Sequence, residues 1–402
     1  MSAVGFVALL AIALLCSSDR RAIDRRAVAA GVGLQLVIAL MLLATPLRDA
    51  LLPVFERLVV ALVGWSQAGA RFLFGPLLDA GHSFALGVLP LIIFMGGLFG
   101  VLYHVGVVQP FVRGMARLLS RTMGVSGAEG LAAASNVFVG MIESGIVVRP
   151  YLARMTRSEL FAFMTLGMST IAGTVLVTYA QILGAAQYAG HLIVASLISA
   201  PAALVVAKIM IPETDAPETA GQTIATHEER AENLIDAAAE GALAGLRLAL
   251  AVGALLIAFV SLIALANSAT GLIGGFMGWP DLTLQTLFGF VFAPVAGLMG
   301  VPWAEAREVG ALIGVKTVLN EFIAYQELAT AIAEGRIGER SALIASYALC
   351  GFANFGSLAI LLGGLEALAP ERRPEAAQLG LRSILAGTIA TCLTGCLAGL
   401  IV

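Results

Sequence analysis

Charged residues are scarce in this sequence. Asp, Glu, Lys and Arg make up 12% of its 402 residues, whereas about a quarter is typical of soluble domains. So few charges cannot cover a water-facing surface of this size, which excludes an ordinary soluble protein. The formal net charge of −3 gives no indication of a nucleic-acid partner.

Residues that usually bind metals or form disulfides are also few. The four cysteines lie in apolar runs without a CxxC pair, and the four histidines occur without an HExxH motif. We therefore expect small buried thiols, no metal site built from Cys and His, and no cofactor. The cysteines are Cys16, Cys350, Cys392 and Cys396, and the histidines are His82, His104, His191 and His227.

Apolar residues, in contrast, make up 59% of the chain, and 45 glycines add to them. Runs of about 20 apolar residues cross a bilayer as helices, and glycine allows close packing and broken helices. We predict an all-α polytopic membrane protein with eight spans. The first run is followed, not preceded, by arginines, so we expect it to stay as a helix. The predicted spans are 2–17, 27–45, 87–107, 158–184, 189–210, 242–268, 340–362 and 378–401.

The positively charged loops predict an orientation. With eight spans, the loops richest in Arg and Lys fall on one side, which should be cytoplasmic. Both termini then lie outside a multi-pass protein of the cell inner (plasma) membrane. These loops are 17–26, 108–157, 208–240 and 363–377.

Two apolar segments, 126–150 and 305–330, carry polar and ionisable residues in their middle. Such residues are costly at bilayer depth unless they face a partner or water. A re-entrant hairpin explains each segment, and each hairpin is followed by two predicted spans. Because the hairpins enter from opposite sides, the two units form an inverted repeat, which places a substrate site near the midplane in many transporters.

The remaining segments complete the expected organisation. Segment 48–76 is amphipathic and predicts an interfacial helix, and 212–240 predicts a linker followed by a surface helix over 228–240. We expect scaffold in 1–125 and 211–304, the latter a cytoplasmic linker, a long sixth span and an interfacial segment. The two transport repeats are expected in 126–210 and 305–402.

Glu143 and Glu321 are the strongest candidates for chemistry. Each lies in a predicted hairpin, where a carboxylate can accept hydrogen bonds from a ligand or carry a proton. The alternative is a salt bridge, for which Lys316 is available to either. Asn354 and Ser357 lie three residues apart, on one helix face, and suit a polyhydroxylated ligand as well as interhelical hydrogen bonds.

Other polar residues have weaker patterns. Oxygen ligands for sodium are available around the first hairpin and the following span, although spacing alone indicates them only weakly. Glu129 is interpreted as a structural helix cap, and Phe352 as core or as a ring-stacking surface.

Several stretches carry a resemblance to the concentrative nucleoside transporter family. They are MGVSGAEGLAAASNVFVG (123–140), VVRPYLARMTRSELFAFMTLGMSTIAGTV (147–175), VLNEFIAYQEL (318–328), ERSALIASYALCGFANFGSLAILLGG (339–364), APERRPEAAQLGLRSILAG (369–387) and LYHVGVVQP (102–110). Together with the hydropathy, the resemblance covers nearly the whole chain.

The resemblance implies eight spans, two re-entrant hairpins and interfacial helices, assembled as a homotrimer that works by an elevator mechanism. It implies ribose contacts for Glu321, Asn354 and Ser357, and nucleobase contacts for Glu143 and the two residues before it. The full predicted substrate set is Met141, Ile142, Glu143, Asn320, Glu321, Phe352, Asn354 and Ser357, and the predicted sodium set is Asn136, Val139, Thr170 and Ile171.

One departure from the family affects the expected substrate. The family has a polar pair before the first-hairpin glutamate, whereas this chain has Met141 and Ile142, and Ser144-Gly145 replaces its Ala-Pro. An apolar pair cannot hydrogen-bond a base edge, so we expect a relaxed or changed base preference. The expected function is sodium- or proton-coupled uptake of a nucleoside or a related ribosyl compound.

Three alternatives are kept. The first is an ion-coupled transporter of a non-nucleoside polar solute. The second is an intramembrane enzyme that uses the paired carboxylates, which the lack of any protease or transferase motif disfavours. The third is a channel, which a multi-contact polar pocket disfavours.

Overall fold

The computed structural model describes residues 1–80, 84–184, 187–222, 224, 231–276, 278–279 and 282–401. Within these ranges the chain forms helices and connecting segments, with no strand. His82 and His227 lie outside the described residues. The predicted all-α membrane fold is confirmed, because six described helices are long and apolar enough to cross a bilayer.

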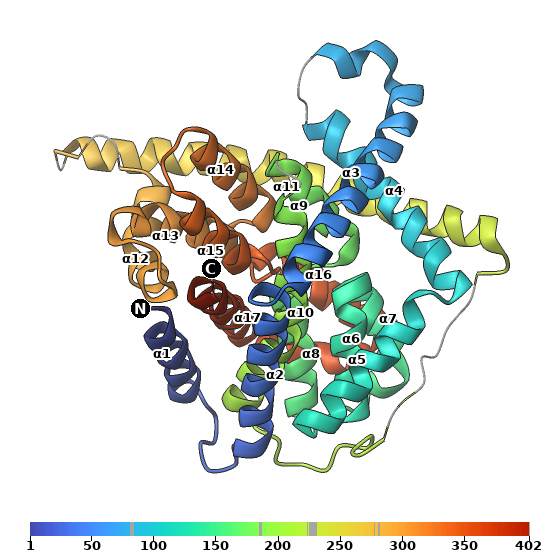
Figure 1. Ribbon diagram of the computed structural model, residues 1–402. Coiled ribbons are helices and arrows are strands. Elements are labelled where there is room, and N and C mark those ends of the chain that lie inside the picture. The colour runs from blue at the N-terminus through green and yellow to red at the C-terminus, as the bar shows by residue number, and fades with distance from the viewer. Residues whose placement is uncertain are drawn as a thin grey trace.

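The helices of the N-terminal part precede the first hairpin (Figure 1). Asp24 caps α2 by accepting a hydrogen bond from the Arg26 amide at 2.8 Å. The predicted amphipathic helix over 48–76 is present as one helix, α3, whose last turns project from the bundle (Figure 1). The elements are α1 (Ser2–Leu15), α2 (Arg25–Leu43), α3 (Leu47–Phe74), the 3₁₀ turn η1 (Gly75–Ala80), α4 (Phe84–Val105) and α5 (Val108–Met123).

The next helices form the first predicted repeat. The expected hairpin over 126–150 is a helix, a break at Gly140 with φ of 102°, and a second helix. The predicted span 158–184 consists of two helices, because the chain is extended at Thr170 and Ala172. The elements are α6 (Gly127–Val139), α7 (Met141–Leu152), α8 (Arg157–Ser169), α9 (Gly173–Ile182) and α10 (Gln187–Met210).

The C-terminal helices repeat this order. The hairpin expected over 305–330 breaks at Leu319 and Asn320, and the span expected over 340–362 breaks between Cys350 and Asn354. The elements are α13 (Trp303–Val318), α14 (Glu321–Ala333), α15 (Glu339–Leu349), α16 (Phe355–Leu368), the 3₁₀ turn η2 (Pro370–Arg372) and α17 (Arg373–Ile401).

The two repeats pack into each other. Helix α8 of the first repeat contacts α17 of the second, and α15 of the second contacts α10 of the first. Where the two broken helices cross, a Cβ on Gly351 would lie 2.9 Å from the carbonyl oxygen of Ser169. A glycine is therefore required there, and the two breaks meet backbone to backbone.

Two helices lie between the two repeats in the sequence. Helix α11 (Leu234–Phe276) runs across the molecule and packs along α4 (Figure 1). Helix α12 (Leu284–Met299) packs against α13, and the two are bent by 116° at the break between them. Helix α5 packs against α6, so the helix before each hairpin packs against the first helix of that hairpin.

The surface helix predicted over 228–240 is helical from Leu234 onward, but it is not separate from the following span. Residues 228–230 lie outside the described residues, and from Leu234 the chain is already part of α11, which continues to Phe276. The charged start and the apolar run form one uninterrupted helix, since neither proline nor an extended residue separates them. Helix α5, in a region expected as a loop, was not predicted.

Candidate functional site

The carboxylate of Glu321 lies at the centre of a polar cluster between the repeats. It is buried in the first turn of α14. The hydroxyl of Tyr179 on α9 donates to Oε1 at 2.9 Å, and Nδ2 of Asn354 donates to Oε2 at 2.8 Å. One residue from each of three elements therefore meets at this carboxylate, and each oxygen keeps a lone pair for a ligand.

The helix breaks hold these side chains in place. Asn320 is the N-cap of α14, and its Oδ1 accepts from the Ile323 amide at 2.9 Å. Asn354 is the N-cap of α16, and its Oδ1 accepts from the Ser357 amide at 2.7 Å. Because Asn354 uses its oxygen for the cap, its amide nitrogen is directed to Glu321.

Tyr179 was not predicted as a site residue. Its ring is stacked on Tyr325, with centroids 4.6 Å apart, and lies edge-on to Phe322. These contacts fix the hydroxyl on Glu321. The only sequence signal was a polar group inside an otherwise apolar segment, which is weak evidence because a tyrosine is common in cores.

Glu143 has a different environment. It lies in the first turn of α7, is exposed, and makes no side-chain hydrogen bond or ion pair with any other described residue. Its Oε2 lies beside the helix break, 3.2 Å from the position of a Cβ on Gly140. The carboxylate is therefore available to a ligand, and it lies at a helix N-terminus that favours negative charge.

The two residues before Glu143 pack between helices. Met141 is buried, and its Cβ lies 3.1 Å from the position of a Cβ on Gly167 of α8. Ile142 is half-buried, with Cγ1 at 3.5 Å from the corresponding position on Gly364 of α16. Both side chains thus give this end of the cluster an apolar wall.

The predicted sodium residues lie at the two breaks of the first repeat. Asn136 donates through Nδ2 to the Leu166 carbonyl at 2.8 Å and to Oγ1 of Thr170 at 2.5 Å. The Ile171 carbonyl accepts from Ser196 at 3.2 Å. Val139 is the last residue of α6, so its carbonyl is one of those a helix end leaves unpaired within the helix. Turning the Asn136 amide would present its oxygen to a cation.

Lys316 does not form the salt bridge that was open as an alternative. Its Nζ donates to the Ala348 carbonyl at 3.0 Å and to Oγ1 of Thr391 at 2.8 Å. No ion pair within the described part of the chain includes it. Glu129 does act as a cap, because it forms a capping box with Ser126 and also pairs with Lys208 at 2.6 Å.

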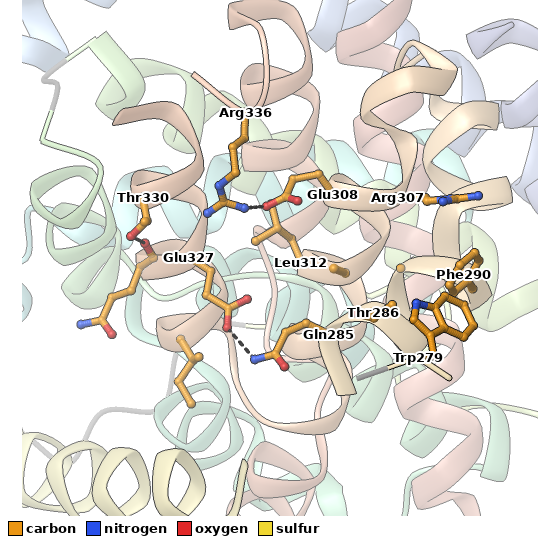
Figure 2. A pocket seen from close by; sticks show the side chains of 14 residues that line it. Trp279, Gln285, Thr286, Phe290, Arg307, Glu308, Leu312, Glu327, Thr330 and Arg336 are labelled. Carbon is orange, nitrogen blue, oxygen red and sulfur yellow. Dashed lines mark hydrogen bonds and ion pairs between the residues drawn. The ribbon is translucent and has the colours of Figure 1, made fainter. Parts of the chain in front are cut away.

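A cavity of about 680 Å³ is lined by residues of α12, α13 and α14 (Figure 2). Its lining includes Glu327 of α14, whose carboxylate accepts from Gln285 of α12 at 3.2 Å. Gln285 in turn accepts from Asn267 of α11 at 3.1 Å. The cavity does not include Glu321 or Glu143 among its lining residues, so it is separate from the polar cluster.

The described residues contain no group of three or more His, Cys, Asp and Glu side chains placed to hold a metal ion. The oxygens gathered at the first repeat are amide, hydroxyl and carbonyl oxygens, which suit a hard monovalent cation rather than zinc.

Models of known families match most of the chain. The models for the C-terminus and the N-terminus of Na+ dependent nucleoside transporters match residues 191–399 and 4–77. A model described as nucleoside recognition matches residues 85–186.

Two bacterial relatives align over nearly their full length. The chain is 45% identical to an uncharacterized transporter, YutK, of Bacillus subtilis, over 99% of this chain and 98% of that protein. It is 36% identical to the nucleoside permease NupC of Helicobacter pylori, over 100% of this chain and 97% of that protein.

The fold is also shared with solved structures. A structure of CNTnw in an inward-facing substrate-bound state has a TM-score of 0.93 and 41% identity, covering 100% of this chain and 97% of that chain. A variant of CNTnw in an outward-facing state has a TM-score of 0.94 and 41% identity, covering 100% of this chain and 96% of that chain.

Proposed function

Because this chain belongs to the Na+ dependent nucleoside transporter family, we propose that it takes up a nucleoside or a related ribosyl compound by cation symport. It belongs to a family of multi-pass membrane transport proteins, not of enzymes. The observation that carries the proposal is the buried Glu321 carboxylate, held by Tyr179 and Asn354 between the two repeats.

The sugar end of the substrate would bind at the second repeat. Glu321 accepts hydrogen bonds from two ribose hydroxyls, with Asn354 and Ser357 on the adjacent break and Asn320 and Phe352 beside them. A carboxylate whose position is already fixed binds hydroxyls without reorganisation. This arrangement supports a polyhydroxylated ligand.

The base end would bind at the first repeat, against Met141, Ile142 and Glu143. Only Glu143 offers a hydrogen bond from its side chain here, so the base is held by one carboxylate and an apolar wall. Such a site discriminates weakly between bases. The same feature favours, as a second candidate, a polar solute other than a standard nucleoside.

Sodium would be the coupling ion, bound by Asn136, Val139, Thr170 and Ile171. Nδ2 of Asn136 donates to Oγ1 of Thr170 at 2.5 Å, and an ion at this position would instead be bound by the oxygen of the turned Asn136 amide and by the Thr170 hydroxyl oxygen. The unpartnered Glu143 favours a proton as the alternative coupling ion, since a carboxylate can carry one.

Transport would follow an elevator mechanism in a homotrimer of the inner (plasma) membrane, with both termini outside. Two transport repeats, 126–210 and 305–402, would move against a scaffold of 1–125 and 211–304. The inward- and outward-facing structures of CNTnw support alternating access within this fold. Exposed apolar side chains on the scaffold, such as Ile257 and Phe276 on α11, support contact with lipid or other copies.

The test is uptake by the purified chain in liposomes. Labelled uridine, adenosine and inosine are each offered with an inward sodium gradient, an inward proton gradient or neither. We expect accumulation that requires the sodium gradient. Accumulation driven only by the proton gradient would mean that the coupling ion is a proton and not sodium. If the folded protein accumulated no nucleoside under any gradient, the proposal that its substrate is a nucleoside would be wrong.

A further inference from the structure

The chain has two lysines, and both are buried in the helical bundle, but their surroundings differ. Lys208 pairs with Glu129 at 2.6 Å. Lys316, in the last turn of α13, is fully buried and donates to one carbonyl and one hydroxyl. Burying an ammonium without a paired carboxylate is costly, so this position calls for a functional explanation.

Lys316 occupies the place in the second repeat that Asn136 occupies in the first. Asn136 lies four residues before Gly140, the N-cap of the second hairpin helix, and Lys316 lies four residues before Asn320, the corresponding N-cap. Both side chains emerge from the end of the first hairpin helix.

Their partners correspond as well. Asn136 donates to the carbonyl of Leu166, and Lys316 donates to the carbonyl of Ala348. Leu166 lies six residues before Ala172, the N-cap of α9, and Ala348 lies six residues before Asn354, the N-cap of α16. The same carbonyl of the broken helix is therefore used in both repeats.

The long helices α10 and α17 also carry hydroxyl residues at corresponding positions. They meet at Ser199 and Thr394, whose hydroxyl oxygens are 3.3 Å apart. Three residues earlier on each helix, Ser196 donates to the Ile171 carbonyl and Thr391 accepts from Lys316. In Figure 1, α13, α15 and α17 lie near one another, and α13 and α17 each contact α15.

Two differences separate the two arrangements. Thr170, two residues before the α9 N-cap, presents a hydroxyl to Asn136, whereas the residue two positions before the α16 N-cap is Phe352. The second repeat thus lacks one oxygen and has an ammonium where the first repeat has an amide.

We propose that the Lys316 ammonium is a fixed cation in the second repeat, at the position equivalent to the sodium site of the first. Its side chain supplies the positive charge that the first repeat would take up as a bound sodium ion, and so it limits the chain to one bound sodium. The inference rests on the proposed sodium site, but it concerns a residue and a position that the proposed function does not use.

The experiment is equilibrium binding of ²²Na⁺ to the purified full chain in lipid nanodiscs, with choline as the replacement cation. We expect the wild-type chain to bind about one sodium ion and Lys316→Asn to bind about two, because the amide gives the second repeat the oxygen donor of the first. Thr317→Asn, which places an amide one residue further along α13, should bind as the wild type does.

The outcomes separate this inference from the proposed function. Folded Lys316→Asn that binds no more sodium than the wild type overturns the fixed-cation proposal. Absence of sodium binding by the wild type contradicts sodium coupling, while a gain of one ion in Lys316→Asn would still support the role of Lys316.

The reciprocal variant tests the proposal if Lys316→Asn does not fold. Asn136→Lys places an ammonium in the first repeat and should abolish ²²Na⁺ binding in a protein with an unchanged elution profile. Sodium binding at the wild-type level in this variant would overturn the equivalence of the two positions.

Discussion

The two hairpins each present a carboxylate in the first turn of their second helix, but the surroundings of these carboxylates are opposite. Glu321 is buried and accepts from Tyr179 and Asn354. Glu143 is exposed and has no side-chain partner among the described residues. The fixed carboxylate of Glu321 suits the part of the ligand that all substrates share. The free carboxylate of Glu143 suits the part that differs between substrates.

The comparison also explains why this chain differs from the family pattern at the two residues before Glu143. The polar residues around Glu321 are tied into helix caps, so changing one would disturb the local fold as well as the site. Met141 and Ile142 only pack against neighbouring helices. Residues at the Glu143 end can therefore change with less effect on folding.

Glu321→Gln should have the largest effect. The amide keeps the size of the side chain but offers one acceptor oxygen instead of two charged ones, and charge-assisted hydrogen bonds contribute about 1.5–3 kcal/mol each. We expect uptake of labelled uridine at limiting concentration to fall about 100-fold. Uptake within a factor of two of the wild type would exclude Glu321 from the substrate site.

Glu143→Gln should have a smaller effect, about tenfold on the same uptake, because one free carboxylate is replaced by an amide that can still hydrogen-bond a base. Measured beside Glu321→Gln in the same liposomes, it ranks the two ends of the site. A larger loss in Glu143→Gln than in Glu321→Gln would reverse the comparison between the hairpins.

Tyr179→Phe should reduce uptake about fivefold, since it removes one donor from Glu321 and keeps the ring stacked on Tyr325. Tyr325→Phe is the matched control. Its hydroxyl donates to the Ser346 carbonyl at 2.9 Å and not to Glu321. Equal losses in the two variants would mean that the effect is structural.

Much of this arrangement could be predicted from the sequence, because charged and amide side chains inside apolar segments mark broken helices. Asn320 lies at the observed break of one predicted hairpin, and the break of the other, at Gly140, falls between Asn136 and Glu143. Helix α5 was missed although the sequence carried a signal for it. Arg113 and Arg117, four residues apart, already indicated one polar face of the helix α5.

Other features depend on pairs that are distant in the sequence. The partners of Lys316 lie 32 and 75 residues further along the chain, and Tyr179 and Glu321 are 142 residues apart. Periodicity describes only local faces of a helix. Such contacts follow from how the two repeats cross, which the sequence of either repeat alone does not specify.

Ile142→Thr should have the smallest effect and the most specific one. The threonine keeps a β-branched shape beside Gly364 and adds a hydroxyl at the end of the site where the base is proposed to bind. A new hydrogen bond to one base edge would change the uptake ratio of uridine to adenosine about threefold to tenfold. Ile142→Val, which also shortens the side chain but adds no hydroxyl, is the control, and an equal change of the ratio in both variants would attribute it to shape. A ratio that changes only in Ile142→Thr would mean that the side chain at position 142 takes part in setting the base preference.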